Sequence, residues 1–172
     1  MTPGEALDRV ALHDLVMRYC RGVDRRDFTL VRSLYWDDAV DRHGAMFEGS
    51  PDEFVAWLPT AMAGFELTVH RITNSLFVVD RDEAEGEHYT IAYHRTAPPD
   101  RRELIVGGRY LDRYRRRDGV WKFSERSLVF DHGEARAVDE VGFAQLGADA
   151  PHGTADRTDP SWSLQQLGGL AA

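Results

Sequence analysis

Two patterns of apolar residues follow one another along the chain, first the spacing of helices and then the composition of strands. Up to residue 64, most apolar residues recur every three or four positions, with one short extended stretch at Tyr35–Val40. From residue 67 onward, β-branched and aromatic residues form long segments separated by turn residues. Helices followed by strands in this order predict an α+β fold.

The first part of the chain predicts three helices. Thr2-Pro-Gly-Glu5 and Ser50-Pro-Asp-Glu53 both read as capping boxes with proline at the first helical position. The first helix is expected to end near Asp24, and a short second helix to cover Phe28–Leu34. The third helix starts after Ser50, contains Pro59 and ends at Gly64.

The second part predicts four strands joined by short turns, at Leu67–Val79, Ala84–Thr96, Arg102–Arg116 and Val120–Asp131. Consecutive strands joined in this way form an antiparallel meander. We expect this sheet to be strongly curved and to close over the N-terminal helices as a cone-shaped α+β barrel that encloses a pocket. Residues 1–135 then form a single domain, and residues 136–172 form a mostly irregular C-terminal extension.

The charge of the chain excludes some partners. Lysine and arginine number 21 against 29 aspartates and glutamates, so the formal net charge is −8. Such a protein is a poor ligand for nucleic acid or for an anionic membrane surface. One cysteine, Cys20, cannot form an intramolecular disulfide, and no signal-peptide pattern or membrane-length apolar run is visible. We therefore expect a cytoplasmic location.

His70 is the first residue that suggests chemistry. Strict alternation along its strand would put one set of side chains on the inner face: His70, Ile72, Asn74 and Leu76. An inward histidine needs a partner, and Asp24 at the end of the first helix is suitable. The carboxylate would fix the imidazole tautomer and leave the other nitrogen as a base. The residues alone equally allow a core histidine that Asp24 merely satisfies.

Three further residues have two interpretations each. Tyr19 lies one turn before Asp24 on the apolar stripe, so it is either a core residue or a phenol that points into the pocket. His94 is either a second acid or base or a residue at the rim. Arg126 either binds a substrate oxygen or forms a salt bridge to an inward acid such as Asp112.

Several motifs are missing from the sequence. It has no glycine-rich phosphate loop, no paired-cysteine zinc motif, no His-Glu-x-x-His and no Gly-x-Ser-x-Gly. The seven histidines are scattered, with no ligand spacing among them. The sequence therefore predicts neither a cofactor nor a metal.

The order of the elements and a set of short motifs resemble a known family. The motifs are Tyr19-x-x-x-x-Asp24, Leu34–Val40, His70-x-x-x-Asn74, Gly108–Asp112, Arg117–Trp121 and Arg126. Over residues 5–135, they resemble the SnoaL-like family of the nuclear transport factor 2-like superfamily. Within it, the arrangement is similar to gamma-hexachlorocyclohexane dehydrochlorinase, scytalone dehydratase and bile acid 7α-dehydratase.

This resemblance implies a cofactor-independent lyase with an Asp–His dyad. His70 matches the general base, and Asp24 matches the aspartate that orients it. Tyr19 and Arg126 match residues that assist the leaving group or polarise a carbonyl, and His94 lies near a second histidine that donates a proton. The resemblance also implies a small, hydrophobic, cyclic substrate and a homo-oligomer, either a trimer or a dimer.

The same resemblance leaves two other functions open. Isomerases and polyketide cyclases of this fold use a similar dyad, and they return a product of unchanged mass or a closed ring. Other relatives, such as the β subunits of ring-hydroxylating dioxygenases, have a ligand-binding or assembly role without catalysis. Pro59 in the third helix and the C-terminal extension depart from the family pattern.

Overall fold

A computed structural model describes residues 1–138, 147 and 149–164 and confirms the predicted α+β fold. The helices are α1 (Pro3–Asp24), α2 (Phe28–Ser33) and α3 (Pro51–Met62). Both capping boxes form, because Thr2 and Glu5 bond each other's main chain at the start of α1, as do Ser50 and Glu53 at α3. Local capping chemistry therefore sets where α1 and α3 begin.

The strands form one mixed sheet of six strands in the order β2-β1-β6-β5-β4-β3. Their bounds are β1 (Tyr35–Arg42), β2 (Glu48–Gly49), β3 (Phe65–Asp80), β4 (Glu83–Thr96), β5 (Arg102–Arg117) and β6 (Val120–Ala137). Strands β3 to β6 form the predicted antiparallel meander, and β1 joins β6 in parallel. The parallel pairing places Asp41 opposite Arg126.

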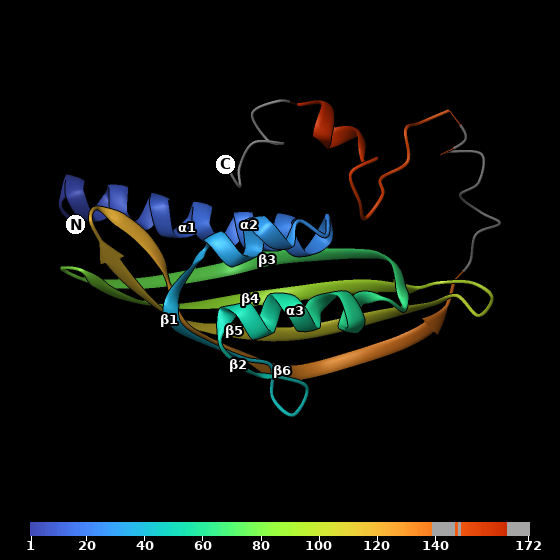
Figure 1. The fold of residues 1–172 in the computed structure, drawn as a ribbon, viewed down its shortest axis with the longest axis horizontal. Coiled ribbons are helices and arrows are strands. Elements are labelled where there is room, and N and C mark those ends of the chain that lie inside the picture. Colours follow the sequence, from blue (N-terminus) through green and yellow to red (C-terminus); the bar gives the residue numbers. More distant parts are fainter. Residues whose placement is uncertain (139–146, 148, 165–172) are drawn as a thin grey trace.

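The sheet is not closed on itself, and the helices pack on it as the predicted cone-shaped α+β fold requires. Strands β2 and β3 are the two edges of the sheet. Helix α1 packs along β3, and α3 packs on β1 and β2 (Figure 1). The hydrophobic core fills the space between helices and sheet, with buried residues from α1, α3 and the inward positions of the strands.

A β-bulge in β3 changes which side chains point inward. The register with β4 shifts between Ile72 and Ser75. After the bulge, Phe77 is buried at 6% exposure, whereas Leu76 is 63% exposed. The predicted inward positions of Asn74 and Leu76 are therefore wrong, because one extra residue in a strand reverses its alternation. His70 and Ile72 precede the shift and keep the predicted face.

Strand β6 is longer than predicted and ends at Ala137 instead of Asp131. Its last residues pair with the start of β5, where Arg102 lies opposite Ala137. The polar and small residues in this segment hid the strand from the sequence pattern. The pairing partner on β5, not local composition, keeps the segment extended.

The described part of the C-terminal extension packs on α1, on the side away from the sheet (Figure 1). Asp159 is buried and lies 3.4 Å from the Arg25 guanidinium. Trp162, in the short 3₁₀ helix Pro160–Ser163, contacts the Arg21 guanidinium at 5.4 Å. Trp162 thus anchors this segment on α1, whereas Leu164 is 56% exposed.

The division into residues 1–135 and 136–172 stays a prediction, since residues 139–146, 148 and 165–172 lie outside the described part. Among the described helices, none combines the length and apolarity that a membrane crossing requires.

Candidate functional site

Asp24 and His70 lie in direct contact at the end of α1. Asp24 Oδ1 is 2.7 Å from His70 Nδ1, and Asp24 Oδ2 accepts the main-chain N–H of His70 at 2.9 Å. An ionised carboxylate only accepts hydrogen bonds, so Nδ1 carries the proton and Nε2 keeps a free lone pair. The His70 side chain is 9% exposed and the Asp24 side chain is 12% exposed. The arrangement therefore presents one imidazole nitrogen as a proton acceptor.

The turn after α1 fixes the position of Asp24. Arg26 has a positive φ of 54°, which reverses the chain immediately after the helix. Its guanidinium then donates to Thr68 Oγ1 at 3.1 Å and to the Phe65 carbonyl at 3.3 Å. Arg26 thereby ties the end of α1 to β3 just before His70, which holds the two halves of the pair in register.

His94 lies beside this pair. Its ring is 5.6 Å from the His70 ring, edge to face, and 4.8 Å from Phe65. Burial and, second, the nearby His70 lower the pKa of His94 to about 4. His94 is therefore neutral near pH 7, so it is suited to hydrogen bonding and poorly suited to supplying a proton as an imidazolium.

Tyr19 is buried in the aromatic core. Its ring contacts Tyr35, Tyr110 and Phe123 at centroid distances of 6.5, 5.8 and 6.1 Å. Burial raises the pKa of the Tyr19 phenol well above its usual value, with Tyr110 and Asp41 adding to the rise. The phenol thus stays protonated and has a hydrogen to donate.

Arg126 is completely buried and forms an ion pair with Asp112. Its Nε and Nη2 donate to the two carboxylate oxygens at 2.8 and 2.6 Å. The guanidinium carbon lies 4.0 Å from the Tyr19 ring and 4.2 Å from the rings of Tyr110 and Phe123. The salt bridge that the sequence offered as one interpretation is therefore present. Nη1 alone has no partner among the described residues.

The predicted residues thus fall into two groups. Asp24, His70 and His94 lie together at the β3 side of the molecule, while Tyr19 and Arg126 lie together in the aromatic core. In the described part of the chain, no hydrogen bond or ring contact links Tyr19 or Arg126 directly to His70.

A second Asp–His pair was missed from the sequence. His43 Nδ1 lies 2.6 Å from Asp41 Oδ1, and Tyr35 donates its hydroxyl proton to Asp41 Oδ2 at 2.6 Å. The usable signal was the spacing, because residues two apart in an extended segment share a face.

Within the described ranges, no three histidine, cysteine, aspartate or glutamate side chains gather closely enough to hold a metal ion. A buried polar network surrounds Asp112. Tyr114 donates to Asp112 at 2.8 Å, and His88 Nε2 is 2.8 Å from the Tyr114 hydroxyl. Burial is the main cause that lowers the pKa of His88 to about 4, so this histidine is neutral near pH 7 in a network that also holds the Arg126–Asp112 ion pair.

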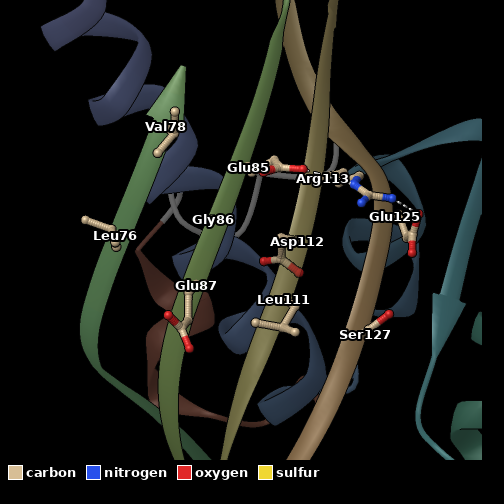
Figure 2. Close-up of a pocket in the computed structure, with 10 residues that line it drawn as sticks. All are labelled: Leu76, Val78, Glu85, Gly86, Glu87, Leu111, Asp112, Arg113, Glu125 and Ser127. Atoms are coloured by element: carbon tan, nitrogen blue, oxygen red, sulfur yellow. Dashed lines mark hydrogen bonds and ion pairs between the residues drawn. The ribbon is translucent and has the colours of Figure 1, made fainter. Parts of the chain in front are cut away.

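A surface hollow crosses strands β3 to β6 on the outer face of the sheet (Figure 2). Its apolar lining includes Leu76, Val78 and Leu111, and an ion pair between Arg113 and Glu125 crosses one end at 3.2 Å. These side chains alternate with buried residues that face the helices. The hollow therefore lies on the opposite face of the sheet from Asp24 and His70.

Comparison with known proteins gives a consistent family. Residues 4–127 match the SnoaL-like domain family. Gamma-hexachlorocyclohexane dehydrochlorinase of Sphingobium indicum is 30% identical over 132 residues, which cover 72% of this chain and 81% of that enzyme.

Solved structures agree on the fold. A crystal structure of a type 2 hexachlorocyclohexane dehydrochlorinase has a TM-score of 0.72 at 24% identity, covering 78% of this chain and 93% of that one. A candidate scytalone dehydratase from Novosphingobium aromaticivorans has a TM-score of 0.71 at 24% identity. The match covers 83% of this chain and 98% of that one. At these identities the likeness establishes the architecture alone.

Proposed function

The chain belongs to the SnoaL-like domain family, and from this membership we propose that it is a cofactor-independent lyase of the dehydratase or dehydrohalogenase type. The substrate is a small, hydrophobic, cyclic molecule. Both the reaction class and the substrate class follow the dehydrochlorinase relatives and the chemistry that the inward-facing polar groups can perform.

The observation that carries the proposal is the 2.7 Å contact between Asp24 Oδ1 and His70 Nδ1. It leaves Nε2 of His70 as a general base, while Asp24 orients the ring and stabilises the imidazolium that forms. His70 Nε2 takes a proton from carbon, the C–H electron pair becomes the new double bond, and the leaving group departs from the neighbouring carbon. This elimination needs no redox partner.

The remaining residues assist this step. Tyr19 stays protonated and has a hydroxyl hydrogen to offer, and the Arg126 guanidinium, paired with Asp112, lies 4.0 Å from its ring. His94 contacts His70 edge to face and supplies a neutral hydrogen-bonding group. We assign all three to the stabilisation of negative charge that develops on the substrate.

Two further expectations accompany the proposal. The exposed apolar side chains on the outer sheet face, which include Leu76 and Val78 at 63% exposure, favour association into a homo-oligomer. A cytoplasmic location is expected from the single cysteine.

The runner-up function is an isomerase or a polyketide-cyclase-type enzyme, which the same Asp24–His70 contact would serve. A non-catalytic ligand-binding or assembly subunit is the remaining alternative. The fixed His70 ring, whose Nε2 is not used in the contact with Asp24, argues against it.

The test combines a His70→Ala variant with product analysis. Small cyclic probes, including γ-hexachlorocyclohexane and 3-hydroxycyclohexanone, are incubated with the protein, and released halide, released water and product mass are measured. The variant should lose about 10²–10⁴-fold in turnover. His132→Gln, at an exposed histidine, serves as the matched control. Undiminished turnover by His70→Ala contradicts the proposal, and a product of unchanged mass favours the isomerase.

A further inference from the structure

The turn after α1 contains two consecutive arginines, Arg25 and Arg26, that bond in opposite directions. Arg26 has a positive φ of 54°, and its guanidinium donates to two oxygen atoms of β3. Arg25 has an ordinary φ of −105°, and its Nε lies 3.4 Å from a carboxylate oxygen of Asp159, in the C-terminal extension. Asp24 directly precedes both arginines. The end of α1 is therefore held by the sheet on one side and by the extension on the other (Figure 1).

Residues 154–163 of the extension fold around the carboxylate of Asp159. This side chain is 5% exposed and accepts the main-chain N–H groups of Thr154 and Ser161, each at 3.0 Å. The Ser161 hydroxyl donates to the same carboxylate. These bonds lie within the segment and fix the direction of the two carboxylate oxygens. Asp159 thus presents to Arg25 a negative charge whose position the segment itself has set.

A second contact ties the segment to α1 one turn before Arg25. Arg21 Nη1 donates to Ser161 Oγ at 3.1 Å, and the Arg21 guanidinium lies 5.4 Å from the Trp162 ring. Residues four apart are neighbours on a helix surface, so Arg21 and Arg25 reach the same segment. Asp24 lies between them in the sequence and turns its carboxylate to β3. Both arginines that flank Asp24 in the last turn of α1 are thus bonded to the extension.

Asp24 needs this support because it is the last residue of its helix. The last four carbonyl groups of an α-helix have no partner within the helix, so a helix end is held by its surroundings. Arg25 Nη1 donates to one of these groups, the Asp24 carbonyl, at 3.3 Å. A carboxylate that orients a catalytic imidazole must stay within about 0.5 Å of its productive position. The contact between Arg25 and Asp159 therefore bears on the reaction through Asp24.

Resting on the lyase function proposed above, we propose that Arg25 is a positioning residue for the Asp24–His70 pair and that residues 154–163 hold Arg25 in place. The segment lies on the side of α1 away from the sheet, whereas the carboxylate of Asp24 faces β3 (Figure 1). The segment therefore acts on how Asp24 orients His70 and leaves the affinity for substrate unchanged. A segment that covered the substrate would do the opposite, because it would change the affinity and leave the pair as it is.

Kinetic constants distinguish these two roles. With γ-hexachlorocyclohexane as the probe, Arg25→Gln should lower kcat about tenfold and change KM less than about twofold, because a displaced base loses its effect in the transition state. Asp159→Ala should give the same loss. The double variant should lose no more than either single variant, since both substitutions break one contact.

The matched control is Arg18→Gln, at an arginine on the same helix that pairs with Asp14 at 2.7 Å. It should change neither kcat nor KM. A rise in KM at unchanged kcat in Arg25→Gln would assign the segment to substrate binding and overturn the positioning role. Losses that multiply in the double variant, or parent constants in Arg25→Gln, also overturn it.

A second measurement needs no substrate and decides the matter for a protein that does not turn over the probe. In ¹⁵N-histidine-labelled protein, the Nδ1–H proton of His70 reports its hydrogen bond to Asp24, and its resonance is assigned by its absence from His70→Ala. This resonance should broaden or move upfield in Arg25→Gln and stay unchanged in Arg18→Gln. An unchanged resonance in Arg25→Gln overturns the inference. Activity retained by His70→Ala would instead overturn the lyase proposal, and the resonance would still report whether Arg25 positions Asp24.

Discussion

Asp24 receives two hydrogen bonds from a single residue, His70, one from the imidazole Nδ1 and one from the main-chain N–H. The double contact fixes the position of β3 and the rotation of the ring at once. It joins the last residue of α1 to the middle of a strand 46 residues later. Side-chain chemistry and backbone structure therefore depend on the same carboxylate.

Replacing Asp24 by asparagine should separate these two roles. The amide oxygen still accepts the main-chain N–H, but the amide NH₂ faces Nδ1 and favours the tautomer in which Nε2 carries the proton. We expect kcat/KM to fall about 10²–10⁴-fold, with unfolding free energy changed by less than about 1 kcal/mol. Asp14→Asn, at an exposed aspartate on the same helix, is the control. A fully active Asp24→Asn protein would contradict the tautomer argument.

The buried histidines should make the fold sensitive to mild acid. The pKa of both His88 and His94 is about 4 in the folded chain, chiefly through burial, against about 6.5 in an unfolded one. The unfolded state therefore binds protons first, and the stability present above pH 6.5 is lost as the pH falls toward 4.

Urea unfolding at pH 7.5 and pH 5.0 measures this effect. The difference in unfolding free energy between the two pH values should shrink in His88→Gln, because that variant has one fewer depressed group. It should stay unchanged in His132→Gln. Equal pH dependence of His88→Gln and the parent protein would show that His88 does not contribute to it.

Removing only one member of the Arg126–Asp112 ion pair should strongly lower the unfolding free energy. Arg126→Met leaves a buried carboxylate without its cation, and we expect a loss of about 3–5 kcal/mol in unfolding free energy. The double variant Arg126→Met/Asp112→Asn should lose less than the sum of the single losses. Arg113→Met removes an arginine that is 63% exposed and should cost no more than about 1 kcal/mol. Additive single losses would disprove the coupling.

Gly22 and Gly64 should respond differently to alanine. A Cβ at Gly22 would lie 2.7 Å from Val31 Cγ2, whereas at Gly64 it would meet nothing within 4 Å. Gly22→Ala should therefore destabilise the protein by about 1–2 kcal/mol despite the better helix propensity of alanine. Gly64→Ala should be neutral or stabilising by up to about 1 kcal/mol. Thermal unfolding of both variants measures this difference. Equal shifts of Tm in the two variants would contradict the prediction.

The described part of the C-terminal extension should detach when Asp159 is removed. Its carboxylate bonds the main chain at Thr154 and Ser161 and lies near Arg25. In Asp159→Ala, trypsin should cleave after Arg157 several-fold faster, while the unfolding free energy of the whole protein changes by about 1 kcal/mol or less. Asp149→Ala is the control. Unchanged cleavage would mean that Trp162 alone holds the segment.

The sequence predicted those features that depend on neighbouring residues. The starts of α1 and α3 followed from Thr2 and Ser50, because a capping box is complete within four positions. The inward face of His70 followed from the alternation of its own strand, and its contact with Asp24 followed from the resemblance to a family. These features need no knowledge of the distant partner strand.

Features that depend on distant partners were missed. The bulge in β3 reflects how that strand pairs with β4, and the residues around Asn74 carry no sequence pattern that predicts it. His43 lies in a turn, so its pairing with Asp41 becomes visible only when β1 is known to extend to Arg42. The parallel pairing of β1 with β6 likewise joins segments far apart in the sequence, and no local pattern encodes it.

The main-chain half of the Asp24–His70 contact has a consequence for solubility. Strand β3 is an edge of the sheet, and an edge strand offers unpaired N–H groups to which another chain can add a strand. Asp24 occupies one such group, that of His70, and brings the charged end of a helix against the edge. Loss of this carboxylate should thus promote strand-to-strand aggregation, so selection against such aggregation would retain Asp24 even where no reaction requires it.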